Sequence, residues 1–377
     1  MEWSYWERTA FVGRPDIVVV GGGITGLSTA IFLRARFPRR PVLLLERGTL
    51  PMGASTRNAG FACFGSPTEL LADLANDGSD QVWQTVEMRW KGLLQLREMV
   101  GDDALNYRAL GGNEIFCDTP DDQRQFDQVM HRLPDLNKQL HSITGTRHTF
   151  RVANDLISNF GLRDVRHLIH NSLEGQLHPG QLIRALRARA RDVGVTILSG
   201  IGVTQLLEHT KGVRIVTDQR MDIQAERVFV ATNGFATQLI PELDLQPARN
   251  QVMITRPIRT LRLSGTFHYQ QGYIYFRNVG SFRFLIGGAR HLDPEGERTD
   301  QFGNHPIIRQ ALLEFAERIL LDDHEYSVDT WWSGILGVGR GKQPIVRRVS
   351  ERIAVGVRLG GMGVAIGTMV SRQLAKL

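Results

Sequence analysis

Two short apolar runs flank an amphipathic segment near the start of the chain. Residues 16–20 and 42–45 are rich in aliphatic and β-branched side chains, as expected of buried strands. Between them, residues 24–36 place large aliphatic side chains near one face of a helix, and Pro38 and Pro41 end that pattern. A strand, a helix and a second strand within about thirty residues predict a βαβ unit and a parallel sheet.

The remaining pattern predicts a second domain inserted into the first. Residues 76–161 are polar and amphipathic, and a helix is predicted over 81–100, where the apolar stripe indicates core packing. Further helices are predicted over 179–192, 306–320 and 364–376, and strands over 195–198, 203–208, 213–217, 227–231 and 353–357, with a strand-rich region over 245–289. We therefore assign 1–75, 150–244 and 326–377 to a discontinuous cofactor domain, and 76–149 and 245–325 to a substrate domain.

Composition narrows the class of protein. The chain has 377 residues and a net charge of +6, without a long basic run that would predict a nucleic-acid groove. Its two cysteines, Cys63 and Cys117, are too few for a disulfide framework and fit a reducing compartment. No apolar run is long enough for a membrane span, and the first residues do not resemble a secretory signal. A cytoplasmic protein is expected.

A glycine-rich loop joins the first strand to the first helix. It reads Gly21-Gly22-Gly23-Ile24-Thr25-Gly26. In this context Gly21 permits a tight turn, Gly23 lets the backbone approach a pyrophosphate, and Gly26 lets helix and strand pack closely. Free N–H groups at the start of the helix attract the phosphates. The loop predicts a dinucleotide site.

The second strand ends at Glu46, where a carboxylate accepts hydrogen bonds from an adenosine ribose and disfavours a 2′-phosphate. Arg47 follows it and is assigned to the same site. Soon afterwards comes a loop of small and hydroxylated residues with one arginine, which suits contact with a pyrophosphate and a flavin ring. It reads Gly53-Ala54-Ser55-Thr56-Arg57-Asn58-Ala59-Gly60.

Together, these two loops and Glu46 resemble the D-amino-acid oxidase-type FAD-dependent oxidoreductases, over nearly the whole chain. The resemblance implies an α/β (α+β) fold, with a Rossmann-like FAD-binding domain of glutathione-reductase type and an inserted antiparallel-sheet substrate domain. It also implies further FAD contacts at Val203, Thr232, Asn233, Gly234, Gly334, Gly361, Met362, Gly363 and Val364. A helix beginning near Val364 directs its positive end at the charge of a reduced flavin.

The chain departs from its relatives at three places. No cysteine lies near residues 334–341, where sarcosine oxidases attach their flavin, so non-covalent FAD is expected. Leu285 stands where several relatives have a lysine that assists oxygen, which leaves both an oxidase and a dehydrogenase open. Leu336 stands where glycine oxidase has a carboxylate-binding arginine, which favours an amine or N-substituted substrate.

Substrate contacts are predicted at Leu336 and on one strand face. Tyr273, Tyr275 and Arg277 share that face by alternation, either as a pocket wall in which Arg277 holds an anionic group or as a mixed packed face. No metal site is expected at His167 and His170, and His178 is predicted to begin a helix. Cys63 follows the Arg57-Asn58 loop and is interpreted as a buried, inert thiol, with a position close to the flavin as the alternative.

These features predict an FAD-dependent oxidoreductase that oxidises a C–N bond of a small amine or amino acid by hydride transfer to flavin. Electrons would pass to oxygen or another acceptor, and no obligate catalytic base is assigned. Two alternatives stay open, a flavin-dependent hydroxylase that uses NAD(P)H and a non-enzymatic FAD-binding redox sensor.

Overall fold

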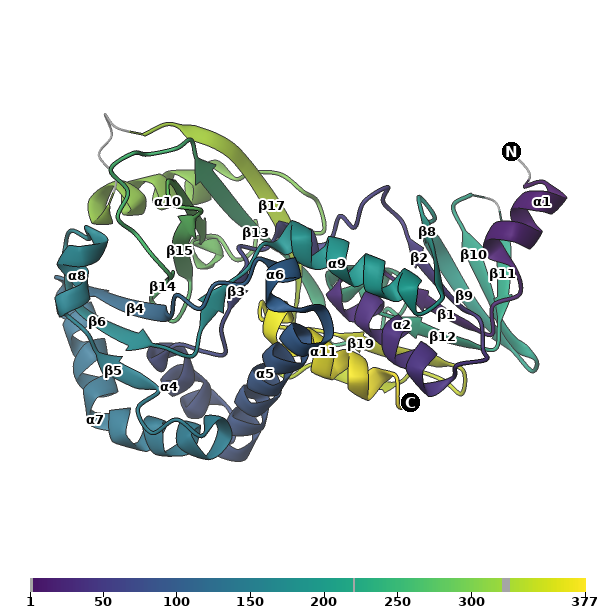
Figure 1. Cartoon of the computed structure of the whole chain (residues 1–377), viewed down its shortest axis with the longest axis horizontal. Coiled ribbons are helices and arrows are strands. Elements are labelled where there is room, and N and C mark those ends of the chain that lie inside the picture. Colours follow the sequence, from purple (N-terminus) through teal and green to yellow (C-terminus); the bar gives the residue numbers. More distant parts are fainter. Residues whose placement is uncertain (1–2, 220, 321–325) are drawn as a thin grey trace.

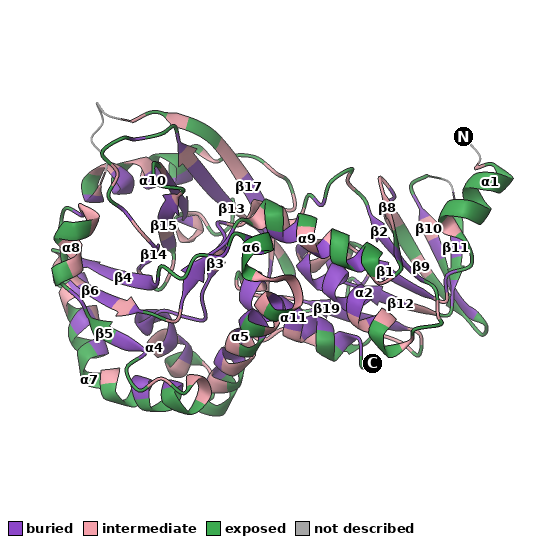
Figure 2. Cartoon of the chain, viewed as in Figure 1, coloured by how far each residue is buried: buried purple, intermediate pink, exposed green. Residues whose placement is uncertain are grey.

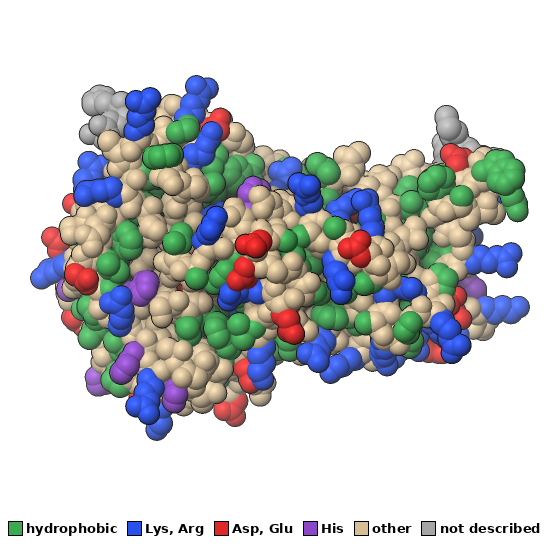
Figure 3. All heavy atoms as spheres, in the orientation of Figure 1, with side chains coloured by type: hydrophobic (Ala, Val, Ile, Leu, Met, Phe, Trp, Pro, Cys, Tyr) green, Lys and Arg blue, Asp and Glu red, His purple; other side chains and the backbone are tan. Residues whose placement is uncertain are grey.

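The computed structural model describes residues 3–219, 221–320 and 326–377. These residues form two lobes that lie side by side, each built around its own sheet (Figure 1). Strands are largely buried in both lobes, while the outer faces of the helices are exposed (Figure 2). Lys and Arg side chains are spread over the whole of the visible face (Figure 3).

The cofactor lobe contains a six-stranded sheet in the order β18-β19-β12-β1-β2-β8. Five strands are parallel and β18 is an antiparallel edge. Their bounds are β1 Ile17–Val20, β2 Val42–Glu46, β8 Val195–Ser199, β12 Arg227–Val230, β18 Ile345–Arg348 and β19 Ile353–Val357. The sheet confirms the predicted βαβ unit, because β1 pairs in parallel with β2 through the helix α2 (Ile24–Arg36).

Apolar layers cover both faces of this sheet. On one face α2 packs with α5 (Ser79–Val100), α9 (Pro179–Asp192) and α11 (Gly363–Leu374) around Leu27, Leu44 and Leu182. Against the other face lies a three-stranded sheet of β9 (Val203–His209), β10 (Gly212–Thr217) and β11 (Asp222–Ala225). Burial on both faces explains why the central strands are continuous apolar runs.

The substrate lobe contains an eight-stranded sheet in the order β17-β13-β16-β15-β14-β4-β6-β5. All neighbours are antiparallel except β14 and β4. Their bounds are β4 Gly112–Cys117, β5 Phe150–Val152, β6 Val165–Asn171, β13 Gln246–Thr255, β14 Thr266–Tyr269, β15 Ile274–Val279, β16 Arg283–Gly288 and β17 Val328–Val338. Helices α4 (Pro67–Asn76), α7 (Pro120–Thr144), α8 (Asp155–Phe160) and α10 (Pro306–Ile319) complete this lobe (Figure 1).

The sheet pairing corrects the expected domain boundaries. Residues 150–171 and 328–338 were assigned to the cofactor domain, yet β5, β6 and β17 are hydrogen-bonded into the eight-stranded sheet. β17 pairs with β13 along nearly its whole length, so part of the glycine-rich run over 334–341 is strand. Pairing between segments about eighty residues apart leaves no local signature in the sequence.

Short elements complete the two lobes and the segments between them. These are α1 (Tyr5–Glu7), η1 (Arg8–Val12), α3 (Ala54–Arg57), β3 (Phe61–Ala62), α6 (Asp102–Leu105), β7 (Gly175–Gln176), η2 (Asn233–Gln238) and η3 (Arg290–Leu292). β3 pairs with β7, and η2 packs against both β13 and β17. In the parts of the chain that the structure describes, no helix combines the length and the apolar character needed to cross a membrane.

Candidate active site

A cavity of about 460 Å³ runs between the six-stranded and the eight-stranded sheet. One end is lined by Glu46 and Val203, and the other by His268 and Tyr275. The cavity volume is in the range of small-molecule sites. We call the first part the cofactor end and the second part the substrate end.

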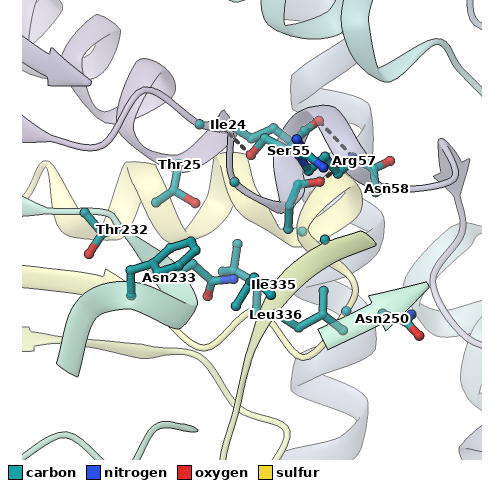
Figure 4. A pocket seen from close by; sticks show the side chains of 18 of the residues that line it. Ile24, Thr25, Ser55, Arg57, Asn58, Thr232, Asn233, Asn250, Ile335 and Leu336 are labelled. Carbon is teal, nitrogen blue, oxygen red and sulfur yellow. Dashed lines mark hydrogen bonds between the residues drawn. The ribbon is translucent and has the colours of Figure 1, made fainter. Parts of the chain in front are cut away.

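The loop between β1 and α2 forms one wall of the cofactor end, lined by residues 20–25. A Cβ at Gly26 would lie 1.8 Å from the carbonyl oxygen of Gly21, so only glycine lets β1 and α2 pack this closely. The main-chain N–H of Ile24 points to the hydroxyl of Ser55, which accepts it at 3.0 Å (Figure 4). Glycine at residues 21–23 leaves this stretch of backbone without side chains, as a pyrophosphate cradle requires.

Glu46 ends β2 at the edge of the same wall. Its buried carboxylate accepts hydrogen bonds from the N–H groups of Gly22, at 2.8 Å, and Gly48, at 3.0 Å. Arg47 lies over the ring of Phe235 at 3.8 Å from its centre and also lines the cavity. Val203, at the start of β9, lines this end as well. A carboxylate held in place between two backbone donors is suited to a ribose.

The helix α3 and its flanking residues form the middle of the cavity. The side chains of Ser55, Arg57 and Asn58 lie together along this wall (Figure 4). Arg57 donates to the carbonyl of Ser333 at 3.0 Å, and the indole N–H of Trp332 donates to the carbonyl of Arg57 at 2.9 Å. The two lobes are therefore joined where α3 meets β17.

Further predicted cofactor residues also line the cavity. The lining includes Ala54, Ala59, Thr232, Asn233, Gly334, Gly361, Met362, Gly363 and Val364. The hydroxyl of Thr232 is buried without a partner among the described residues, which leaves a polar group for a ligand. α11 begins at Gly363, so the N-terminus of this long helix borders the cavity.

Besides Gly26, three predicted cofactor residues lie behind the lining. Thr56 donates its hydroxyl to the carbonyl of Pro51 at 2.5 Å, and Gly60 donates its N–H to the side chain of Asn58. A Cβ at Gly234 would lie 2.4 Å from the carbonyl oxygen of Leu336, so this glycine allows η2 to approach β17. They support the lining and do not belong to it.

The substrate end is a wall of neutral polar and aromatic side chains from neighbouring strands. Asn250 donates to the hydroxyl of Tyr275 at 2.9 Å, and His268 is the cross-strand partner of Tyr275. The ring of Phe61 stands edge-on to both His268 and Tyr275, with ring centres 5.2 and 5.4 Å apart. Nε2 of His268 is buried and has no partner among the described residues.

Burial keeps this wall uncharged. It lowers the pKa of His268 to about 4, so the imidazole is neutral near pH 7. It raises the pKa of Tyr275, against the opposing effect of the Arg290 charge, so the phenol keeps its proton. The wall therefore offers hydrogen bonds without a fixed charge.

Arg277 was predicted as a pocket residue that could hold an anionic group, but it does not face the cavity. Its buried guanidinium donates to the carbonyls of Ala59, at 2.5 Å, and Leu177, at 3.1 Å, and it does not line the cavity. Alternation along β15 does place Arg277 on the same side as Tyr275, but the loop around Gly60 covers it. Arg277 ties this loop to the sheet. Tyr273 and Leu336 line the cavity.

The substrate end also includes charged residues that the sequence did not single out. Lys342 pairs with Glu69 at 3.3 Å and with Asp73 at 2.5 Å, and Arg89 pairs with Glu69 at 3.3 Å. Burial alone would raise the pKa of Glu69, but these cations lower it. Arg290 lines the cavity too. They come from α4, α5, η3 and the loop before β18, so no local motif unites them.

The thiol and histidine positions agree with structural roles. Cys63 lines the cavity with its sulfur 3.9 Å from that of Met362, and burial raises its pKa well above the ordinary value. His167 stacks on Phe126, and His170 contacts Asn113. His178 caps α9, as predicted. Among the residues that the structure describes, no three His, Cys, Asp or Glu side chains are grouped to hold a metal.

Residues 16–377 match the family model of the FAD dependent oxidoreductases. The chain belongs to this family. It is therefore an FAD-dependent oxidoreductase, as the two loops and Glu46 predicted, and both loops and Glu46 line the cofactor end of the cavity.

Related oxidoreductases are distant in sequence. The chain is 22% identical to the probable oxidoreductase OrdL of Rhizobium meliloti (strain 1021), over 98% of this chain and 86% of that protein. It is 25% identical to gamma-glutamylputrescine oxidoreductase of Escherichia coli (strain K12), over 96% and 83%. It is 24% identical to the bifunctional protein ThiO/ThiG of Synechocystis, but it spans only 46% of that longer chain.

Solved structures confirm the predicted fold class. Glycine oxidase from Geobacillus kaustophilus superposes with a TM-score of 0.76 at 20% identity, covering 97% of this chain and 94% of that one. L-proline dehydrogenase from P. horikoshii superposes with a TM-score of 0.74 at 16% identity, covering 97% and 93%. The shared architecture is a Rossmann-like core with an additional antiparallel sheet.

Proposed function

We propose that this oxidoreductase oxidises the C–N bond of a small amine or amino acid, with non-covalently bound FAD as its electron acceptor. One observation carries the proposal: a single cavity joins the dinucleotide cradle at Glu46 to the neutral polar wall at His268 and Tyr275. A substrate on that wall lies next to the middle of the cavity, where the flavin end of a dinucleotide that begins at Glu46 is expected. Glycine oxidase and gamma-glutamylputrescine oxidoreductase, to which the chain is similar, support the substrate class.

The cofactor end offers a contact for each part of FAD. The backbone of residues 21–26 would hold the pyrophosphate, Glu46 the ribose and Val203 the adenine, while α3 and residues 361–364 would border the flavin. When bound, FAD supplies the electron chemistry, since it accepts two electrons and a proton, formally a hydride, from a carbon next to nitrogen.

The chain's own residues prepare the amine. An amine must be uncharged to give up a hydride, and a dry wall without a fixed negative charge lowers the pKa of its ammonium form. Nε2 of His268 and the amide oxygen of Asn250 have no partner among the described residues, and the amide oxygen can accept an amine N–H. The ring of Phe61 lies beside His268 and adds an apolar surface to this wall. Together they bind and orient a neutral amine.

Non-covalent binding rests on the cysteines. The sequence has two, and Cys117 lies outside the cavity lining, in contact with Arg318. Cys63 lines the cavity, but its raised pKa keeps the thiol protonated and a poor nucleophile. Flavin should therefore leave the protein on denaturation in acid and remain in the filtrate.

The wall at Ala59 and Val252, backed by Leu285, is apolar. A cation on such a wall would stabilise the negative charge that forms when oxygen is reduced. Among the described residues this wall carries no cation, and the cationic side chains of the cavity come from other elements, so we propose that electrons pass to an acceptor other than oxygen. The site is then that of a dehydrogenase.

The test is anaerobic reduction of the flavin-loaded protein by a panel of amines and amino acids. Loss of the flavin's visible absorption band with one compound supports the proposal, and slow recovery in air supports the dehydrogenase assignment. Reduction by NADH or NADPH, with no response to any amine, would instead identify a hydroxylase. If none of these compounds reduces the flavin, the proposal that the protein oxidises amines is wrong.

A further inference from the structure

Arg290 places a positive charge at the substrate end of the cavity. It is the first residue of η3, directly after β16, and Ala289 before it adopts a left-handed conformation with φ of 60°. That turn carries the chain past Tyr273, whose carbonyl accepts the N–H of Ala289 at 2.7 Å. The half-buried side chain of Arg290 lines the cavity together with Tyr273 and Tyr275.

The four cationic side chains that line the cavity differ in their partners. Lys342 pairs with Glu69 and Asp73, and Arg57 donates to a carbonyl and lies over the ring of Phe302. Arg47, at the cofactor end, lies over the ring of Phe235. Arg290 has neither a hydrogen bond, an ion pair nor a ring contact from its side chain within residues 3–219, 221–320 and 326–377.

An unpartnered guanidinium in a partly buried site favours an anion. It presents five N–H donors in one plane, and two of them match the two oxygens of a carboxylate. The acidic side chain at this end of the cavity, Glu69, is already neutralised by Arg89 and Lys342. A ligand in this part of the cavity can therefore supply the negative charge that pairs with Arg290.

We propose that Arg290 binds a carboxylate of the substrate, so that the substrate is an amino acid or an N-substituted amino acid and not a simple amine. The inference rests on the proposed function, because it assumes that the substrate's amine lies against Asn250, His268 and Tyr275. A carboxylate on Arg290 then gives the substrate a second fixed point at the same end of the cavity. Two fixed points set which C–H bond faces the middle of the cavity.

A binding measurement tests Arg290 without turnover. Acetate and acetamide have nearly the same shape, and only acetate is charged. Each is titrated into the flavin-loaded protein while the flavin absorption spectrum is recorded. We expect acetate to change the flavin spectrum of the unmodified protein. The Arg290→Gln variant should bind acetate about 100-fold more weakly, whereas the affinity for acetamide should be nearly the same in both proteins.

Arg298→Gln is the matched control, since Arg298 is an exposed arginine of the following loop and lies outside the cavity lining. It should bind acetate as the unmodified protein does. Arg290→Lys keeps the charge but not the planar fork, and it should recover part of the affinity. Equal acetate binding by the unmodified protein and Arg290→Gln would overturn the proposal, and so would a failure of the unmodified protein to bind acetate.

A substrate comparison separates this inference from the proposed function. N-methylglycine and N-methylglycinamide, and alanine and ethylamine, are offered anaerobically in pairs. Preference for the carboxylate member, with a loss in kcat/KM of about 100-fold in Arg290→Gln, supports Arg290 as the anion site. If the uncharged members reduce the flavin equally well in both proteins, the proposed function stands and the role of Arg290 falls. If no amine reduces it, the proposed function falls and acetate binding still decides the role of Arg290.

Discussion

The two ends of the cavity differ in the groups that line them, which are mainly main-chain groups at one end and side chains at the other. The cofactor end is mainly main chain, with the N–H groups of the β1–α2 loop and one carboxylate, Glu46, fixed by backbone donors. The substrate end is side chains brought together from β13, β14, β15 and η3. Main-chain groups keep one ligand while the sequence around them varies, whereas a few exchanged side chains are enough to change a substrate. This division explains how one fold can keep the same cofactor while its substrate changes.

The largest effect is expected where the cofactor end depends on close packing of the backbone. Gly26→Ala places a Cβ 1.8 Å from the carbonyl oxygen of Gly21, so β1 and α2 must separate. We expect a loss of about 3 kcal/mol or more in the free energy of unfolding, and protein without flavin. Gly78→Ala is the control, since nothing lies within 4 Å of its Cβ. Full flavin content in the Gly26→Ala variant would contradict the claim that FAD binding depends on close backbone packing at the cofactor end.

Glu174, a buried carboxyl outside the cavity lining, should make the stability of the protein depend on pH. Burial raises the pKa of Glu174 from 4.5 to about 8, so the folded protein keeps a proton that the unfolded chain releases. The free energy of unfolding should therefore fall as pH rises from about 4.5 to 8. Glu174→Gln should flatten this part of the pH profile. Above pH 8, the free energy of unfolding of this variant should exceed that of the unmodified protein by on the order of 3 kcal/mol.

The measurement is denaturant unfolding at a series of pH values. Glu242→Gln, at an exposed position, should keep the pH profile of the unmodified protein. An unchanged slope in Glu174→Gln would show that this carboxyl is ionised in the folded state.

A smaller effect should be confined to the cofactor end. Glu46→Gln removes the charge from an acceptor that would bind the ribose, which should weaken FAD binding about 10- to 100-fold. The KM for an amine, measured with saturating FAD, should not change. Titration of the flavin-free protein with FAD gives the first quantity. A large change in KM would mean that the two ends are coupled.

The smallest effect is expected at the substrate end. Tyr275→Phe removes the hydroxyl that accepts from Asn250 at 2.9 Å, and should lower kcat/KM about 3- to 10-fold. FAD affinity should stay the same, because the hydroxyl belongs to the wall of the substrate end. The rate of anaerobic flavin reduction measures the first quantity, and loss of flavin from this variant would contradict its placement.

The same division explains what the sequence alone could predict. The βαβ unit, Glu46 and the start of α9 follow from local patterns, and the structure places them within a residue or two. The sheet membership of β5, β6 and β17 depends on distant partners. His268 and Arg290 carry no motif, and they join the site only through the pairing of β14 with β15 and the turn after β16.

Arg277 shows the limit of alternation as a guide. Alternation gave the correct side of β15, but it could not show that the carbonyls of Ala59 and Leu177 would cover the guanidinium. Arg290, outside the strand, has the exposure to the cavity that Arg277 lacks.

The central claim, that one cavity brings FAD and a small amine together, has a direct test. Flavin-loaded protein is mixed anaerobically with amino acids, N-methyl amino acids and simple amines, and the flavin absorption band is followed in time. The account predicts rapid bleaching by at least one of them, with a rate that saturates with its concentration. Protein that takes up no FAD, or bound flavin that none of these compounds reduces, would contradict it.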